Sequence, residues 1–179
     1  MKFVPLDIPD VIVIEPEIFK DERGLFFESY NFLKYSTGFD REINFVQDNC
    51  SNSKMGVIRG LHYQEKPYQQ GKLIRVTSGE IFDVAVDIRK DSPYFGKHVF
   101  VNLSSENRKQ IWIPAGFAHG FQVLSEGTEV TYKVDNYYSK DHERTIYPFD
   151  IDLKIEWPIK KNMLLSEKDK QGLAFNEIK

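Results

Sequence analysis

Residues 72–88 read KLIRVTSGEIFDVAVDI and contain two short runs rich in apolar and β-branched residues, separated by a Ser-Gly pair. Runs of this length and composition, bounded by turn-forming residues, are typical of β-strands. Side chains alternate between the two faces of a strand, so residues 81–88 divide into two rows. One row holds Phe82, Val84, Val86 and Ile88, and the other holds Ile81, Asp83, Ala85 and Asp87. The stretch therefore predicts two consecutive strands, the second with one apolar row and one row that includes carboxylates.

Similar strand patterns recur along most of the chain. Besides Lys72–Thr77 and Ile81–Ile88, we expect strands at Val11–Ile14, Val57–Gln64, His98–Leu103, Gln110–Ile113, Gly120–Leu124 and Thr128–Val134. Short helical segments are expected at Glu28–Tyr35 and Ser166–Gln171. Short strands at this spacing are typical of a sandwich or barrel. No internal repeat or flexible linker divides the 179 residues, so the sequence predicts one all-β domain over residues 1–179.

The composition argues against two classes of protein. The 24 basic and 27 acidic residues are mixed along the chain, so the broad basic face of a nucleic-acid-binding protein is not expected. No window approaches the roughly 18 apolar residues of a membrane span, and Asp7, Asp10 and Glu15 interrupt the N-terminal stretch where a signal peptide would be apolar. Cys50 is the only cysteine, and a lone thiol suits a reducing cytosol. We therefore expect a cytoplasmic protein that binds neither nucleic acid nor membrane.

Two segments carry candidate chemistry: RGLHYQ at residues 59–64 and PAGFAHGF at residues 114–121. The second fits the Pro-x-Gly-x-x-His pattern of cupin barrels, in which the histidine enters the barrel. Metal-binding cupins add a His-x-His pair and a glutamate on an earlier strand, because a metal needs three or four converging ligands. Here His62 is followed two residues later by Gln64, which leaves His62 and His119 without a third strong donor. The sequence therefore favours acid–base chemistry over metal binding.

Several polar side chains fall on expected strands of this small barrel: His62, Lys72, Asp83, His119 and Tyr132. Taken singly, either histidine could be a hydrogen-bonded core residue, and the lysine could be an ordinary strand-end residue. Tyr132 lies in line with Val130 and Val134, so its phenol is expected to point inward and to need a partner. Inward polar groups are costly unless they are paired or used, so their coincidence indicates a functional site.

Many ordered stretches together resemble the dTDP-4-dehydrorhamnose 3,5-epimerase (RmlC) family over essentially the whole chain. The matching stretches are residues 21–24, 45–49, 57–64, 71–73, 79–87, 113–121 and 165–169. The resemblance implies a cupin-like jelly-roll barrel with short peripheral helices, a homodimer, and an enzyme that uses neither a metal nor an organic cofactor. It also implies a substrate class, the dTDP-linked 4-keto-6-deoxy-sugars.

The resemblance also implies roles for matching residues. His62 would be the general base that removes the protons at C3 and C5, and Asp169 the acid that orients and charges it. Tyr132 would be the acid on the opposite face of the sugar, and Lys72 would stabilise the enolate oxygen at C4. The remaining family positions would bind the sugar nucleotide, and they are Phe19, Arg23, Glu28, Gln47, Asp48, Asn49, Arg59, His119, Tyr138, Glu143 and Lys168.

These implied roles agree with what the chemistry requires. A proton next to a ketone is too weakly acidic to leave unaided, so a site needs a base and a cation or donor on the developing enolate. Inversion needs a second proton donor across the ring. A diphosphate favours arginine because the forked guanidinium matches the phosphate oxygens, and Arg23 and Arg59 would take that place.

Three other functions remain open from the sequence. A relative that epimerises only C3 or only C5 would keep the same residues. A sugar-nucleotide ketoisomerase of the same barrel type would be shorter and would lack the Ser-Glu-Lys-Asp segment at residues 166–169. A non-catalytic cupin module that only holds a sugar would not need an opposed base and acid.

One local expectation follows from spacing. Arg59 and His62 are three residues apart, so strict alternation would put them on opposite faces, although the resemblance places both at the substrate. A bulge or bend near Gly60 would bring them to one face.

Overall fold

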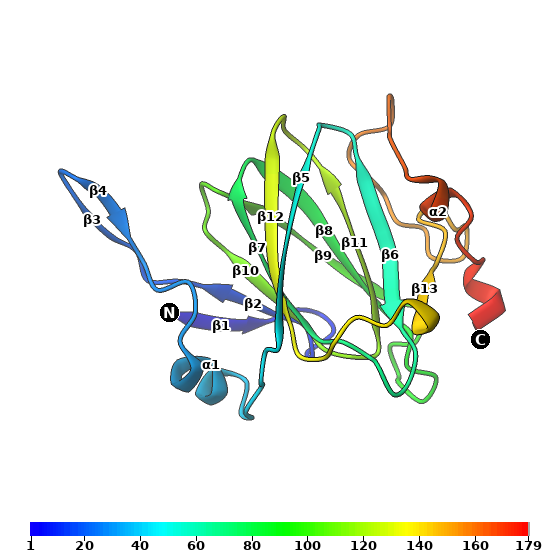
Figure 1. The fold of residues 1–179 in the computed structure, drawn as a ribbon, viewed down its shortest axis with the longest axis horizontal. Coiled ribbons are helices and arrows are strands. Elements are labelled where there is room, and N and C mark those ends of the chain that lie inside the picture. The colour runs from blue at the N-terminus through cyan, green and yellow to red at the C-terminus, as the bar shows by residue number, and fades with distance from the viewer. Residues whose placement is uncertain (179) are drawn as a thin grey trace.

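The computed structural model of the protein describes residues 1–178, and most of its elements are strands (Figure 1). A six-stranded sheet contains, in order across the sheet, β1 (Lys2–Pro5), β2 (Ile12–Glu15), β10 (Gln110–Ile113), β7 (Lys72–Ser78), β12 (Thr128–Val134) and β5 (Gln47–Ser53). A five-stranded sheet contains β13 (Glu143–Thr145), β6 (Ile58–Gln64), β11 (Phe117–Val123), β8 (Glu80–Asp87) and β9 (His98–Ser104). Neighbouring strands are antiparallel throughout.

The two sheets pack against each other as a jelly-roll sandwich. Over residues 1–178 they are separate hydrogen-bonded sheets, so the barrel does not close through its backbone ladders. The expected all-β, cupin-like fold is confirmed in this open form. The helices are short and peripheral, namely α1 (Phe32–Gly38), α2 (Glu167–Lys170) and the 3₁₀ turns η1 (Lys140–His142) and η2 (Phe175–Ile178).

Every strand expected from the sequence overlaps an observed strand, but β1, β3, β4, β5 and β13 were not expected. Strand β5 shows why, because its sequence QDNCSNS lacks the apolar alternation that marks a strand. It is extended because its full length pairs with β12, and such pairing overrides weak local propensity. The expected helix at Glu28–Tyr35 was placed too early. Helix α1 begins at Phe32 because Asn31 caps it, accepting a hydrogen bond from the Lys34 amide at 3.2 Å.

The core between the sheets is formed by the inward rows of the strands. In β8, Ile81 and Ala85 belong to this cluster, whereas Phe82, Val84 and Val86 belong to a second cluster on the outer face. The two predicted rows are therefore confirmed. The outer face is buried because the C-terminal segment, including the fully buried Trp157, packs over it.

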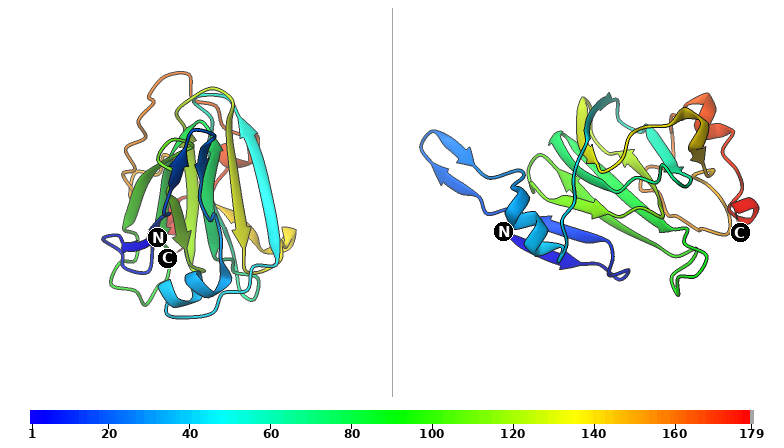
Figure 2. Two further views of the ribbon diagram at one scale, coloured as in Figure 1. Left: turned by 90° about the vertical axis from the view of Figure 1, so that its left-hand side faces the viewer. Right: turned by 60° about the horizontal axis from the view of Figure 1, so that its bottom comes forward.

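Strands β3 (Phe19–Asp21) and β4 (Gly24–Phe26) form a two-stranded hairpin that projects away from the sandwich (Figures 1 and 2). We call residues 19–26 the arm. Its aromatic side chains lack a covering layer, since Phe19 is 55% exposed and Phe26 67% exposed. Exposed apolar side chains grouped in this way are characteristic of surfaces that contact other molecules.

Candidate active site

A cavity of about 270 Å³ lies where strands of both sheets meet the loop before β13. We call it the inter-sheet cavity. Its lining residues are Gln47, Asn49, His62, Tyr63, Gln64, Gln70, Lys72, Tyr132, Tyr138 and Glu143. Three of the four residues expected to be catalytic, His62, Lys72 and Tyr132, therefore line one cavity, and the fourth, Asp169, contacts the first of these.

His62 and Asp169 form a hydrogen-bonded pair across 107 residues of sequence, with Nε2 of the imidazole 2.6 Å from Oδ1 of the carboxylate. Asp169 is 3% exposed, and its backbone amide donates to the Ser166 hydroxyl that caps α2. Burial alone would raise the pKa of Asp169, but hydrogen bonds from His62 and Ser166 outweigh it and lower the pKa. The ionised carboxylate accepts the Nε2 proton, so Nδ1 of a neutral His62 is the ring nitrogen that can accept a proton.

Lys72 is the first residue of β7 and lies in the same row as Ile74 and Val76 of the inner core. Its ammonium donates to the backbone carbonyl of His62 at 3.4 Å, which places the cation beside the proposed base. Burial lowers the pKa of Lys72 to about 8, and the negative charges of Asp83 and Glu143 limit the fall. Lys72 is therefore mostly a cation at neutral pH and loses its charge as the pH rises above about 8.

Tyr132 lies on β12 between β5 and β7, and its ring packs against the inner core. The expected inward orientation is therefore confirmed. Burial raises the pKa of its phenol, although the nearby Arg59 guanidinium opposes the rise. The phenol is consequently protonated at neutral pH and can donate a proton into the cavity that it shares with His62.

His119 and Asp83 form a second imidazole–carboxylate pair deeper in the sandwich, with Nε2 and Oδ2 2.9 Å apart. Burial lowers the pKa of His119, which Asp83 partly opposes, so the imidazole is neutral at neutral pH. His119 lies opposite His62 in the pairing of β11 with β6. It is therefore next to the cavity, although it does not line the cavity in this structure.

The rim of the cavity consists of polar side chains joined by hydrogen bonds and an ion pair. Lys168 on α2 pairs with Glu143 on β13 at 2.5 Å, and the Tyr138 hydroxyl donates to the other oxygen of Glu143 at 2.9 Å. Burial would raise the pKa of Glu143, but hydrogen bonds from Lys168 and Tyr138 outweigh it and lower the pKa. On the facing sheet, the Gln47 amide donates to Asn49 at 2.8 Å.

Arg59 reaches the same side of β6 as His62 because the strand is irregular at Gly60. The pairing with β11 shifts register there, since Arg59 lies opposite Phe121 and His62 opposite His119. Gly60 has a φ of +123°, and a Cβ at this position would lie 2.5 Å from the Gly120 backbone. The guanidinium then bonds Ser53 on the opposite sheet at 3.0 Å. The predicted bulge is confirmed.

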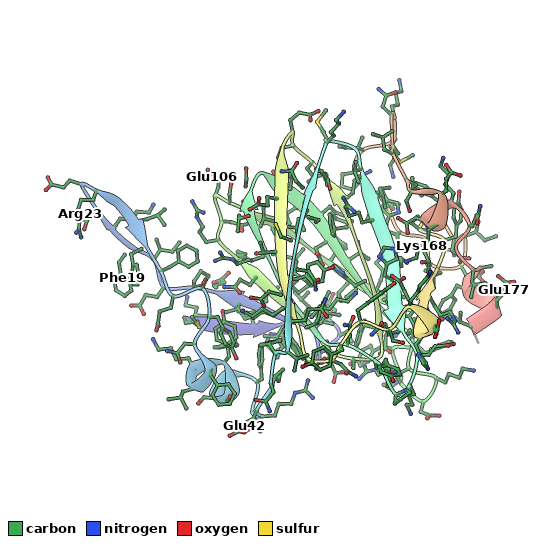
Figure 3. All side chains as sticks on the ribbon, viewed as in Figure 1. Phe19, Arg23, Glu42, Glu106, Lys168 and Glu177 are labelled. Carbon is green, nitrogen blue, oxygen red and sulfur yellow. The ribbon has the colours of Figure 1, made fainter. Side chains whose placement is uncertain are left out.

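Four of the expected substrate-binding residues lie away from the inter-sheet cavity of their own chain. Phe19 and Arg23 are on the arm, at the opposite end of the molecule from Lys168 (Figure 3). Glu28 lies between the arm and α1. Asp48 alternates with the cavity residues of β5 and faces outward, where it pairs with Lys133 at 3.0 Å. One folded chain therefore assembles the residues expected to be catalytic but only part of the expected binding group.

Three lining residues were not predicted from the sequence, namely Tyr63, Gln64 and Gln70. Gln64 had a signal, because it lies two residues after His62 and so shares its face. Its side chain makes hydrogen bonds of 2.6 to 3.1 Å with backbone atoms of the loops on either side of the cavity, and it holds the loop that carries Tyr138. Gln70 lies in a connection without a periodic pattern, so no signal could have identified it.

The arrangement can remove and return protons on a ring held in the cavity. The cavity brings together an imidazole hydrogen-bonded to Asp169, a cation at Lys72 and a phenol at Tyr132. Groups of these types are those needed to form an enolate and to protonate it from another direction. A pair of imidazoles that each bind their own carboxylate is a poor metal site. Among residues 1–178, no three His, Cys, Asp or Glu side chains converge as metal ligands.

Comparison with known proteins identifies the family. The sequence model of the dTDP-4-dehydrorhamnose 3,5-epimerase family matches residues 5–177. An epimerase of that name from Shigella flexneri is 56% identical over 175 residues, covering 98% of this chain and 96% of the relative. The Legionella pneumophila enzyme RmlC, solved in complex with dTDP-4-keto-L-rhamnose, superposes with a TM-score of 0.96 at 47% identity and covers 99% of this chain and 94% of that one.

A solved structure of lower identity has a related but different activity. ChmJ, a 3′-monoepimerase from Streptomyces bikiniensis in complex with dTDP-quinovose, has a TM-score of 0.91 at 31% identity, covering 98% of this chain and 88% of its own. Enzymes that invert one centre thus share this fold with those that invert two. The family match spans nearly the whole chain, and this protein belongs to the dTDP-4-dehydrorhamnose 3,5-epimerase family.

Proposed function

We propose that the protein is a dTDP-4-dehydrorhamnose 3,5-epimerase, an isomerase of dTDP-L-rhamnose biosynthesis. It inverts C3 and C5 of dTDP-4-dehydro-6-deoxy-D-glucose to give dTDP-4-dehydro-L-rhamnose. The observation that carries the proposal is the convergence of the His62–Asp169 pair, Lys72 and Tyr132 on one cavity, in a chain that belongs to this family.

Each inversion then takes place in two proton transfers. His62 removes the proton next to the C4 ketone, while Asp169 stabilises the imidazolium that forms. The Lys72 cation stabilises the negative charge on the C4 oxygen, which is largest in the enolate. Tyr132 donates a proton to the opposite face of the same carbon. The ketone re-forms with the inverted configuration. His62 then releases its proton to solvent and Tyr132 regains one from solvent, and the same cycle at the second carbon completes the reaction.

The remaining expected residues bind the sugar nucleotide. Arg59 grips the diphosphate, and its side chain lies on the same face of β6 as His62. His119 contacts the sugar beside His62. The rim residues Gln47, Asn49, Tyr138, Glu143 and Lys168 surround the opening and take the nucleotide.

Phe19, Arg23 and Glu28 complete the site from a second copy of the chain. The arm cannot reach its own cavity from the opposite end of the molecule (Figure 3). The outer face of the six-stranded sheet near the arm also carries an open hollow of about 340 Å³, lined in part by Cys50, Arg75 and Asp48. A homodimer in which these outer faces meet would cover the arm's exposed phenylalanines and bring Arg23 and Asp48 to the partner.

Mixed dimers test this arrangement. We expect dimers of His62→Ala and Arg23→Ala chains, isolated with two different tags, to regain about half of the wild-type activity. One of the two sites then combines an intact His62 with the intact arm of the other chain. Each homodimeric variant serves as the control. Activity of the mixed dimer no greater than that of the Arg23→Ala homodimer would mean that the arm does not act across the dimer.

Removal of metal ions should leave the reaction unchanged. The proposed chemistry uses only side chains, and His62 and His119 are each committed to a carboxylate. We expect equal turnover before and after treatment with a strong chelator followed by dialysis. A stoichiometric transition metal in the purified protein, together with lost turnover that the same metal restores, would contradict the acid–base mechanism.

The decisive experiment incubates the protein with dTDP-4-keto-6-deoxyglucose in deuterated water. Deuterium at both C3 and C5 of an inverted product supports the proposal. Deuterium at C3 alone or C5 alone would identify a single-centre epimerase. This is the second candidate function, because the chain is also similar to the monoepimerase ChmJ. Binding without exchange at either carbon would identify a sugar-binding module.

We place the enzyme in the cytoplasm as a single catalytic domain over residues 1–179. The lone Cys50 supports a reducing compartment. No helix within residues 1–178 has the length and apolar character needed to cross a membrane.

A further inference from the structure

Asp83 is a fully buried carboxylate that the proposed reaction does not use. It lies on β8 in the inward row with Ile81 and Ala85, and its exposed fraction is 0%. Its Oδ2 bonds His119 at 2.9 Å, whereas Oδ1 has no hydrogen-bond partner among residues 1–178. Buried carboxylates rarely leave an oxygen unpaired, because desolvation penalises the charge. A second, favourable interaction is therefore needed to explain why a carboxylate occupies this buried position.

The compensating charge is Lys72, and a continuous series of contacts links it to Asp83. The Lys72 ammonium donates to the His62 carbonyl at 3.4 Å, His62 lies opposite His119 in the pairing of β6 with β11, and His119 bonds Asp83 at 2.9 Å. The charged and titratable groups around Lys72 come from every packed element: Asp83 on β8, Glu143 on β13, Lys168 and Asp169 on α2, His62 on β6, His119 on β11 and Tyr132 on β12. Among the negative groups, Asp83 opposes the loss of the Lys72 proton more strongly than Glu143 does, and Lys168 favours that loss. Glu143 is also already paired with Lys168.

We propose that Asp83 is a positioning residue whose buried negative charge keeps Lys72 protonated, so that a cation is in place where the C4 oxygen becomes an enolate. Asp83 does not line the cavity, so it acts through Lys72 and His119 rather than on the substrate. The inference rests on the proposed epimerase chemistry, because it assigns a purpose to the charge on Lys72.

Orientation of His119 is a separate role that does not require a charge. The side-chain oxygen of an asparagine at position 83 could accept the same Nε2 proton, but it would bring no negative charge. Asp83→Asn therefore removes only the effect on Lys72 and keeps the shape and the hydrogen bond to His119. A merely structural role for Asp83 would change kcat equally at all pH values, whereas loss of the Lys72 proton would not.

The first test is the pH profile of kcat. In the wild type we expect activity to fall as the pH rises through about 8, where Lys72 loses its proton. In Asp83→Asn we expect this alkaline limb to move down by about one pH unit or more. The variant would then be close to wild type at pH 6 and about tenfold less active at pH 9, with unchanged affinity for dTDP.

Asp87→Asn is the matched control. Asp87 lies on the same strand and is equally buried, but it is held by Arg89 and Ser92 away from the cavity. This control should keep the wild-type alkaline limb whatever its effect on stability. An Asp83→Asn enzyme that is folded and active with its alkaline limb in the wild-type place would overturn the proposal.

Two further measurements do not depend on turnover. The ¹⁵N-lysine NMR signal of Nζ, assigned by its absence in Lys72→Arg, should titrate at a lower pH in Asp83→Asn than in the wild type. Equal titration in both proteins would overturn the role of Asp83, even if the wild type proved inactive on the sugar nucleotide. Inactivity with a shifted titration would instead reject the proposed function and leave the charge pairing standing.

The stability of Lys72→Met provides a second test in case Asp83→Asn fails to fold. Removing the cation leaves the Asp83 carboxylate buried without compensation. We expect the melting temperature of Lys72→Met to approach that of the wild type as the pH is lowered, because protonation relieves the buried charge. A constant difference between pH 5 and pH 8 would contradict the pairing.

Discussion

Replacement of His62 by alanine is expected to abolish both deuterium uptake from solvent and the formation of any epimer. His62 is the proposed base in the inter-sheet cavity, and Asp169 stabilises its protonated form. Without His62 no proton leaves at either carbon. A general base contributes about 10²- to 10⁴-fold, and loss of the first step stops everything that follows. The measurement is NMR of the sugar nucleotide in deuterated water, which reports exchange and inversion together.

His142→Ala provides the control for the removal of an imidazole. His142 bonds Ser139 at 2.8 Å outside the cavity lining, so exchange and inversion should persist. Rapid exchange at C3 or C5 by a folded His62→Ala protein would show that another group removes the protons.

Replacement of Tyr132 by phenylalanine should separate exchange from inversion. The ring that packs against the inner core is kept, and only the hydroxyl is lost. His62 and Lys72 can still form the enolate, and His62 can return the proton to the face from which it came. Solvent exchange should therefore continue, while net inversion falls by about 10²-fold or more, as expected for loss of a general acid. Separate rates of deuterium incorporation and of epimer formation provide the measurement.

Tyr63→Phe is the matched control, because Tyr63 also lines the cavity, from β6, and its ring packs against the outer cluster. It should invert both centres at close to the wild-type rate. Inversion of both centres by Tyr132→Phe at that rate would mean that the phenol is not the opposite-face acid and that another donor supplies the proton.

The inward rows of the strands could be predicted because alternation is a local property. Asp83 and Tyr132 point inward for the same reason that Ile81 and Val130 do. The bulge at Gly60 followed from the three-residue spacing together with the resemblance, which required Arg59 and His62 at one site. These predictions needed no knowledge of which strands are neighbours.

Contacts between distant segments could not be predicted in this way. Pairing of β5 with β12 makes a strand of a polar sequence, and a loop without periodicity brings Gln70 to the cavity. The resemblance to a family could name Arg23 and Asp48 as binding residues, but it gave no indication that a single chain holds them away from its own cavity. Where these residues lie relative to the cavity depends on how distant elements pack, which no local pattern encodes.

The order in which the ribosome makes the chain has a consequence for the pair of His62 and Asp169. The carboxylate is synthesised 107 residues after the imidazole. At typical elongation rates of about 5 to 20 residues per second, the imidazole waits roughly 5 to 20 seconds for its partner. Until α2 has been made and has docked beside β6, the nascent protein holds an imidazole without its carboxylate. Epimerisation should thus begin only after translation has passed α2.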